Sequence, residues 1–263
     1  SNLSILINTL AYNSYITAYN TNMVVNETFL DSATLRENVV SLARNIGYVP
    51  RSKRAAVAQV SFVISGLSST TSSMSIEPGV FANSGLNNSN YIFSLPEKVT
   101  APAKNGISQG VVQIYQGQYL EKQYIFDESQ PNQRFVLPND SIDTSTLRVY
   151  VQDTESSTTQ TEFKLVDSIV GITSISNIYL IQETSDERYE VLFGDGIFGK
   201  KLESGNLIKM SYIKTDGKNG NGANIFNFAG TVKDDSGADA NSIQTTLTTR
   251  IPSENGDDIE SVQ

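Results

Sequence analysis

The fold is decided at Ala55-Ala56-Val57-Ala58-Gln59-Val60-Ser61-Phe62-Val63-Ile64. Side chains alternate between the two faces of a strand, so Ala56, Ala58, Val60, Phe62 and Ile64 share one face. The stretch therefore predicts a half-buried β-strand. Similar stretches follow near 111–116, 123–127, 146–152, 161–166, 178–183, 188–193 and 207–214. Tracts rich in Ser, Thr and Asn separate them and are typical of turns, so we predict a mostly antiparallel β domain over residues 55–250.

A conventional amphipathic helix is predicted just before this domain. Its apolar residues recur at helical spacing: Leu35, Val39, Leu42, Ala43 and Ile46. Asp31 or Ser32 can cap its start, and Thr34-Leu35-Arg36-Glu37 matches a capping box. Gly47 is placed to end the helix, and Pro50 prevents its resumption. We interpret Gly47, Pro50 and the segment 48–54 as a candidate hinge between a helical arm and the β domain.

The arm begins with a longer helix over residues 3–29, which contain neither Pro nor Gly. Placing residues at about 100° intervals gives two nearly opposed apolar stripes, one aliphatic and one rich in Tyr. A surface helix normally buries one face, whereas this helix is predicted to contact partners on both. The candidate interface residues are Leu3, Leu6, Leu10, Tyr12, Tyr15, Ile16, Tyr19 and Met23. The alternative is a central helix in a bundle within the chain, although only one other good helix is available to cover it.

The C-terminal residues 251–263 are predicted to be a loop that enters a further helix, because acids cluster at Asp257, Asp258 and Glu260. Both ends of the chain resemble interrupted elements, so we expect a segment of a longer polypeptide. The predicted fold class is therefore α+β. A helical arm of two helices over 1–54 precedes the β domain, and the chain ends at the start of a further helix.

Composition argues against catalysis and nucleic-acid binding. The chain has no His and no Cys, which removes the commonest general base, the commonest metal ligand and thiol chemistry. Residues 1–56 carry five basic and three acidic side chains, for a charge of +2, and the rest carry 14 basic and 25 acidic, for −11. Such an acidic body repels phosphates. No apolar stretch approaches the roughly 20 residues of a membrane span, so we expect neither nucleic-acid nor membrane partners.

One basic cluster, Arg51, Lys53 and Arg54, has two interpretations, a solvated linker or a docking point for an acidic neighbour. The acidic clusters at 234–239 and 257–260 could attract a divalent cation weakly, but solvated turns and a helix N-terminus explain them better. We therefore predict no metal, no cofactor and no catalytic residue. A glycosidase that uses two carboxylates stays open as a third hypothesis, since carboxylate pairs are plentiful.

The Gly-rich stretch Gly194-Asp195-Gly196-Ile197-Phe198-Gly199 fits the G-x-G-x-x-G pattern of dinucleotide sites. That site requires a helix after the glycines, and here only six residues precede the next Gly turn and strand. A kinase-type glycine loop would need a catalytic-loop His, which the chain lacks. We interpret Gly194, Asp195, Gly196 and Gly199 as a structural turn, with Asp195-Gly196 as a hairpin signal.

Three stretches together resemble baseplate wedge proteins of contractile-tailed myophages, the baseplate J-like family. They are 10–13 with 22–31 and 35–52, then 193–217, and finally Asn255-Gly256-Asp257-Asp258-Ile259-Glu260-Ser261, where Asn255 stands at a position commonly Gly. They cover roughly 40% of the chain in the family's order. The middle region 66–180 is not recognisable and is a candidate variable insert.

The resemblance implies a structural, non-enzymatic subunit of the virion tail baseplate, assembled in the bacterial host cytoplasm. It implies a ring around the tail hub, with helices bundled with a second copy and with a helical wedge protein, and contact with the sheath-initiating subunit. The alternative function is a carbohydrate-binding or adhesin-like β module, which the Ser/Thr/Asn loops and the Tyr content favour.

Overall fold

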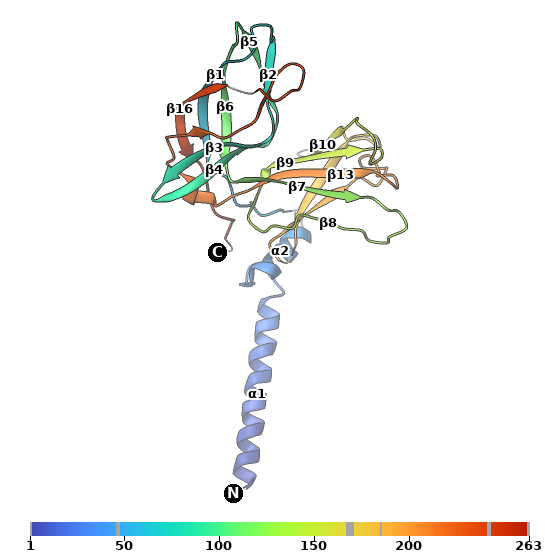
Figure 1. Ribbon diagram of the computed structural model, residues 1–263. Helices are drawn as coiled ribbons and strands as arrows, with labels where there is room; N and C mark the ends of the chain where they lie inside the picture. The colour runs from blue at the N-terminus through green and yellow to red at the C-terminus, as the bar shows by residue number, and fades with distance from the viewer. Residues whose placement is uncertain (1, 46–47, 167–170, 185, 241–242, 262–263) are drawn as a thin grey trace.

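A computed structural model shows a long helix projecting from a body of two β-sheets (Figure 1). It describes residues 2–45, 48–166, 171–184, 186–240 and 243–261. Helix α1 spans Asn2–Asn26 and helix α2 spans Arg36–Asn45. All the strands follow the helices, and their pairing is mostly antiparallel, so the predicted α+β class is confirmed.

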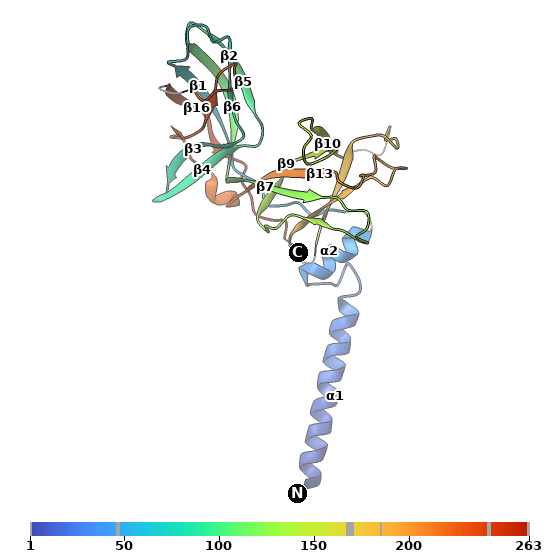
Figure 2. The ribbon, with the colours of Figure 1, turned by 45° about the vertical axis from the view of Figure 1, so that its right-hand side comes forward.

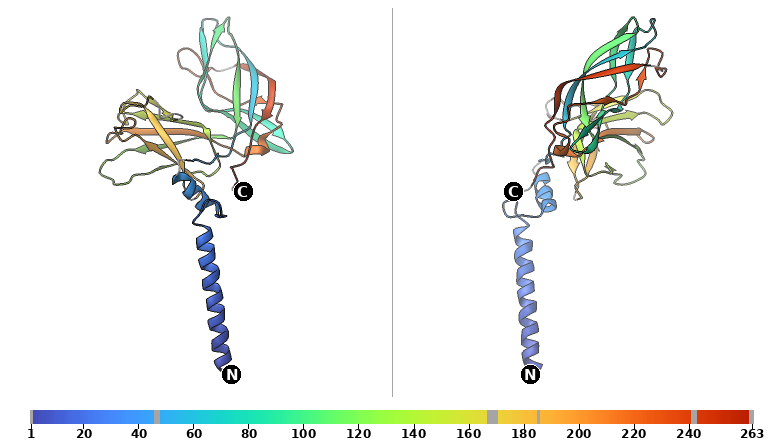
Figure 3. Two further views of the ribbon diagram at one scale, coloured as in Figure 1. Left: turned by 180° about the vertical axis from the view of Figure 1, so that it is seen from behind. Right: turned by 60° about the vertical axis from the view of Figure 1, so that its left-hand side comes forward.

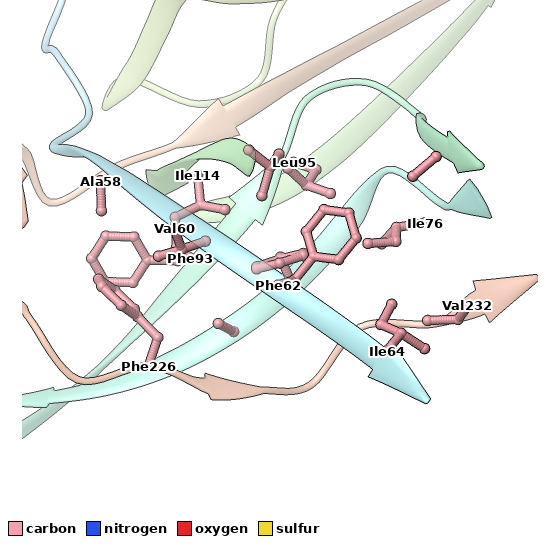
Figure 4. Close-up of a cluster of buried hydrophobic side chains, with 14 of the residues drawn as sticks. Ala58, Val60, Phe62, Ile64, Ile76, Phe93, Leu95, Ile114, Phe226 and Val232 are labelled. Atoms are coloured by element: carbon pink, nitrogen blue, oxygen red, sulfur yellow. The ribbon is translucent and has the colours of Figure 1, made fainter. Parts of the chain in front are cut away.

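The first sheet has nine strands and curls around its own core. Its strands are β1 Val57–Ser65, β2 Ser73–Ile76, β3 Gly79–Leu86, β4 Ser89–Leu95, β5 Val99–Lys104, β6 Ile107–Gln116, β14 Asn227–Phe228, β15 Val232–Lys233 and β16 Gln244–Glu254. Strand β1 lies between β6 and β16, and both neighbours are antiparallel to it. Val60, Phe62 and Ile64 are buried as the alternation predicts, and Figure 4 shows them converging with side chains from other strands.

The second sheet has seven strands and a separate core. Its strands are β7 Gln118–Ile125, β8 Phe135–Val136, β9 Ile142–Gln152, β10 Thr161–Leu165, β11 Ile178–Glu183, β12 Tyr189–Phe193 and β13 Leu207–Lys214. Among the described strands, β10 and β11 form the one parallel pair. The ring of Phe193 contacts Phe135 and Phe163 edge-on, at centroid distances of 5.4 and 5.6 Å. The β region predicted over 55–250 therefore contains two cores.

The second sheet is inserted into the first, because β7–β13 lie between β6 and β14 in the chain. Figures 2 and 3 show the two sheets side by side, with α1 directed away from both. The candidate insert 66–180 is not a separate unit, since β6 pairs with β1 along the whole of Val57–Ser65. Its variability between relatives stays a prediction.

The chain enters the second sheet through Gly117. The backbone of Gly117 has φ +137°, and a Cβ there would lie 2.3 Å from the carbonyl oxygen of Lys214. The entering and leaving strands thus approach so closely that only glycine fits at this position.

The C-terminal region differs from the prediction of a loop and helix at 251–263. Strand β16 continues to Glu254, and no helix begins among residues 255–261. Asn255 has φ 65°, a left-handed conformation that Asn and Gly tolerate, which explains why Asn can replace the Gly common at this position. The acids that predicted a helix start instead bond to basic residues of the same chain, as described below.

Two smaller predictions are also corrected. Neither Asp31 nor Ser32 caps α2; Glu27, beyond α1, accepts hydrogen bonds from the backbone N–H groups of Thr34 and Leu35 at 2.9 and 3.2 Å. The Asp195-Gly196 turn is not a β-hairpin, because β12 pairs with β11 and β8, whereas the following strand β13 pairs with β7 and β9.

Candidate assembly site

The apolar side chains of α1 are exposed on all sides. Leu3, Tyr15 and Met23 keep 64%, 67% and 43% of their surface exposed. Of the eight predicted interface residues, only Ile16 is half-buried. A bundle within the chain would bury one of these stripes, so the described structure excludes that alternative. Monomeric soluble proteins rarely expose contiguous apolar surface of this kind, so the predicted interface on α1 stays a prediction that this exposure favours.

Glu27 fixes the connection between α1 and α2. In addition to the bonds from Thr34 and Leu35, its carboxylate accepts hydrogen bonds from the Thr34 hydroxyl at 2.7 Å and from the Asn38 amide at 2.8 Å. The Asn38 bond, followed by those from Thr34, lowers the pKa of Glu27 to about 2. The carboxylate therefore stays charged and joins the segment before α2 and the Asn38 side chain to the end of α1.

Arg36 joins α2 to the second sheet. Its Nη2 donates to both carboxylate oxygens of Glu183, on β11, at 2.9 and 3.0 Å. It also donates through Nη1 to the backbone carbonyl of Glu260. The Glu183 side chain is 1% exposed, so this is a buried, charge-assisted contact. One guanidinium thus links the arm, the second sheet and the C-terminal segment.

Residues 48–54 pair with residues 257–260, and we call this paired region the clasp. Arg54 N donates to Asp257 O at 2.9 Å, and Asp257 N donates back to Arg54 O at 3.1 Å. Glu260 N donates to Arg51 O at 3.1 Å, and the Glu260 carboxylate accepts from Arg51 N at 2.8 Å and from the Tyr48 hydroxyl at 2.7 Å. The Arg51 guanidinium lies 2.6 Å from the Asp257 carboxylate.

These contacts settle the role of the basic cluster at Arg51 and Arg54. Its acidic neighbour is the C-terminal segment of the same chain, with Arg51 acting through its guanidinium and backbone and Arg54 through its backbone. The bonds from Arg51 and Tyr48 lower the pKa of Glu260, and the Arg51 side chain lowers the pKa of Asp257. Both carboxylates are therefore held in the charged form.

The clasp also contacts the second sheet, and it adjoins the first sheet because it directly precedes β1 and follows β16 in the chain. Beside it, Ala55 N donates to the buried Asp143 carboxylate of β9 at 2.8 Å, and Ser52 bonds with the Thr144 hydroxyl at 2.9 Å. On the other side, Asp258 pairs with Lys218 at 2.7 Å, next to the short 3-10 helix η1, Gly217–Gly220. The base of the arm, the C-terminal segment and both sheets therefore meet at one place.

The candidate hinge lies partly within this network. Gly47 is outside the described residues, Pro50 is buried, and the backbone of Arg51 and Arg54 is bonded to the C-terminal segment. A hinge at 48–54 thus remains a prediction, and its motion requires the clasp bonds to break.

The Gly-rich stretch 194–199 forms a compact loop at the end of β12. The Asp195 carboxylate accepts from the backbone N–H groups of Ile197 and Phe198 at 2.8 Å each, and Gly196 N donates to Gly199 O at 3.0 Å. A Cβ on Gly194 would lie 2.3 Å from the carbonyl carbon of Gly199. The loop turns the chain from β12 toward β13.

Within the described part of the chain, no group of three or more potential ligands could hold a metal ion. Nor does any described helix have the length and apolarity needed to cross a membrane.

Sequence patterns did not indicate three residues that organise this site. Glu27, Glu183 and Gln116 act through partners that are distant in the sequence or outside any motif. Gln116 is 2% exposed, and its amide bonds to Thr215 and Asp216 across the junction between the sheets. The burial of a Gln side chain at the end of a strand, and its bonds to residues distant in the sequence, can be recognised only in the three-dimensional structure.

Comparison with known proteins shows similarity to one class of protein, the baseplate wedge proteins of bacteriophages. The family described as bacteriophage baseplate wedge protein gp6, third domain, matches residues 118–225. This range begins with β7 and ends before β14, so it coincides with the inserted sheet and its exit. It also shows that residues 118–180, part of the candidate variable insert, are recognisable.

The particular relative is the baseplate wedge protein gp6 of Enterobacteria phage T4. It is 27% identical over 252 residues, which cover 88% of this chain and 37% of the relative. The chain thus spans little more than a third of that protein. The similarity confirms the resemblance to baseplate wedge proteins and supports the virion tail as the location, whereas membership of the baseplate J-like family stays a prediction.

Proposed function

We propose that this chain is the part of a baseplate wedge subunit that assembles through α1. The observation that carries the proposal is the exposure of both apolar stripes of a helix directed away from the body. A second copy and a helical wedge protein are the proposed occupants of the two stripes, and the sheath-initiating subunit is a further proposed neighbour. The sheets orient the arm in the ring around the tail hub, and the role is structural.

The different side chains on the two stripes of α1 support two distinct contacts. Leu3, Leu6 and Leu10 form an aliphatic surface, while Tyr12, Tyr15 and Tyr19 present rings with hydroxyls that can bond across an interface. Asn side chains between them favour a defined register over maximal stability, as polar residues do in coiled coils. The arm therefore has the composition of a bundle component with specified neighbours.

The described sheets lack the exposed Tyr side chains that would support a carbohydrate-binding function. Exposed Tyr residues on the sheets would support it, but the exposed Tyr residues of the described chain are Tyr12, Tyr15, Tyr19 and Tyr48, all in the arm or the clasp. Tyr179, Tyr189 and Tyr212 are buried in the second core.

The test changes Tyr12, Tyr15, Tyr19 and Met23 together to Ser in the full chain. Association with a second copy, measured by analytical ultracentrifugation, and with wedge proteins co-expressed from the same phage should be lost, while the circular dichroism of the sheets is retained. The matched control changes Thr9, Thr17 and Thr21 to Ser, which keeps the apolar stripes, the Asn residues and the hydroxyls that bond to the helix backbone. Assembly that survives the first set of changes contradicts the proposal.

A further inference from the structure

The first sheet has a gap between β14 and β16, which do not pair with each other. Strand β16 pairs with β1 and strand β14 with β3, so each has an edge without a strand partner among the described residues. The two segments meet at one end, where Ser253 N donates to Ala223 O at 2.9 Å and the Thr249 hydroxyl donates to Asn224 O at 2.6 Å. Beyond that end, the described chain forms no backbone hydrogen bond across the opening.

A hollow of about 810 Å³ occupies this opening. Phe226 and Phe228 lie on one side of it and Thr245 and Leu247 on the other, while Asp239 borders its far end. The Thr245 hydroxyl is buried and has no hydrogen-bond partner in the described structure. The opening thus offers a mainly polar surface that includes the side chains of Phe226, Phe228 and Leu247, and an unused hydroxyl next to an unpaired strand edge.

The chemistry of a strand edge specifies the kind of occupant. Every second residue of an edge strand directs its backbone N–H and C=O away from the paired neighbour, and an added strand satisfies those groups. Natural edges are protected by bulges, Lys or Pro. Here the bulge-like register shifts are confined to the β1 segment Val57–Val60, opposite residues 249–254, where Arg250 and Pro252 also lie. Residues 244–248 pair regularly with β1 and carry none of these protections.

Charge further restricts the occupant. Asp239 borders the hollow, and Asp234 and Asp235 belong to the same turn. The pKa of Asp234 is lowered by its bond with Ser236, and that of Asp235 by its bonds with Ser72, so the turn is negative at neutral pH. A basic residue at the end of an incoming strand would match this turn.

We propose that the edge of β16 over residues 244–248 is a binding site for an extended segment of another polypeptide chain. The segment has about five residues, the length of the unprotected edge. It carries apolar side chains at alternate positions, which face Phe226, Phe228 and Leu247, and a basic residue beside Asp239. This site is on the opposite part of the body from the exposed arm and does not depend on the function proposed for α1.

The test uses the full chain and a synthetic peptide, Lys-Thr-Val-Thr-Val-Thr-Lys, whose two Lys residues allow either strand direction. Binding should protect the outward-directed backbone amides, every second one over residues 244–248, from hydrogen exchange by tenfold or more. A peptide of the same sequence, N-methylated at alternate residues, should bind at least tenfold more weakly, because it cannot form the edge hydrogen bonds. Equal binding of the two peptides, or no added protection, overturns the proposal.

Two variants test the site itself. Thr246→Lys places a charge on the edge and should weaken peptide binding about tenfold, whereas Gln109→Lys, on an exposed position of the interior strand β6, should leave it unchanged. Asp239→Asn should weaken binding several-fold at low salt and little at high salt. Unchanged affinity in Thr246→Lys, or equal losses in Thr246→Lys and Gln109→Lys, contradicts strand addition at β16.

Discussion

The Nη2 group of Arg36 donates hydrogen bonds to both oxygens of the Glu183 carboxylate, and this pair connects α2 to β11. Glu183 is nearly inaccessible to solvent, and its partner comes from the arm. The orientation of the arm therefore depends on a charge pair whose disruption leaves a carboxylate inside the protein.

Replacing Arg36 with Ala is expected to lower the free energy of unfolding by about 3 kcal/mol, because breaking a buried pair leaves an uncompensated charge. Urea unfolding of the full chain measures the loss. The double variant Arg36→Met with Glu183→Met should recover most of it, since an apolar pair of similar volume avoids the desolvation cost. A single variant as stable as the parent would contradict the role of this pair.

The hydrogen bonds to Glu27 should make the α1–α2 connection sensitive to acid. The pKa of Glu27 is about 2 in the folded chain, below the ordinary value of 4.5 for a glutamate. A lowered folded pKa contributes stability that is present above pH 4.5 and is lost as the pH falls toward 2. The amides of Thr34 and Leu35 should therefore exchange faster as the pH falls through this range, after correction for intrinsic exchange. Glu27→Gln should remove this pH dependence of amide exchange. If the exchange of the variant depends on pH as the parent's does, another group causes the dependence.

Weakening the clasp should release the candidate hinge. Glu260→Gln removes a charged acceptor from Arg51 N and the Tyr48 hydroxyl, so the amide of Arg51 should lose protection from hydrogen exchange by about tenfold, equivalent to about 1.4 kcal/mol. The control is Glu254→Gln, an exposed acid at the end of β16. If the Arg51 amide is equally protected from exchange in the two variants, the Glu260 side chain does not hold the clasp together.

Gln116→Leu should destabilise the junction between the sheets. The variant leaves the Thr215 hydroxyl and the Asp216 N–H without the acceptor that they now contact at 2.8 and 3.0 Å. Unsatisfied buried groups cost about 2 kcal/mol in total free energy of unfolding. Small-angle scattering should also show a wider distribution of distances between the sheets. Gln113→Leu, on an exposed position of the same strand, is the control and should leave both measurements unchanged.

Local periodicity was enough to predict the helices and many of the strands. The alternation around Phe62 identified a strand whose inward side chains are indeed buried, and the stripe of Val39 and Ala43 identified α2. These features depend on neighbours within a few residues, so they are visible in the sequence.

Pairing over long distances could not be predicted in the same way. The acids at 257–260 resemble a helix start because Arg51, the partner of Asp257 and Glu260, lies about 200 positions earlier, and no local rule relates them. The division into two sheets was missed for a similar reason, since every strand has the same period whichever sheet it joins. The exposed stripes of α1 were predicted correctly as surfaces, but a sequence does not identify the partner.

The insertion of one sheet within the other has a consequence for the order of folding. Ser61 and Thr248, neighbours across β1 and β16, are 187 positions apart, and a chain closes such a loop at a large entropic cost. Gln116 and Thr215, 99 positions apart, are brought together by the second sheet. Halving a loop lowers its closure cost by about 0.6 kcal/mol. If the inserted sheet forms first, the outer sheet therefore closes around a loop of roughly half the length.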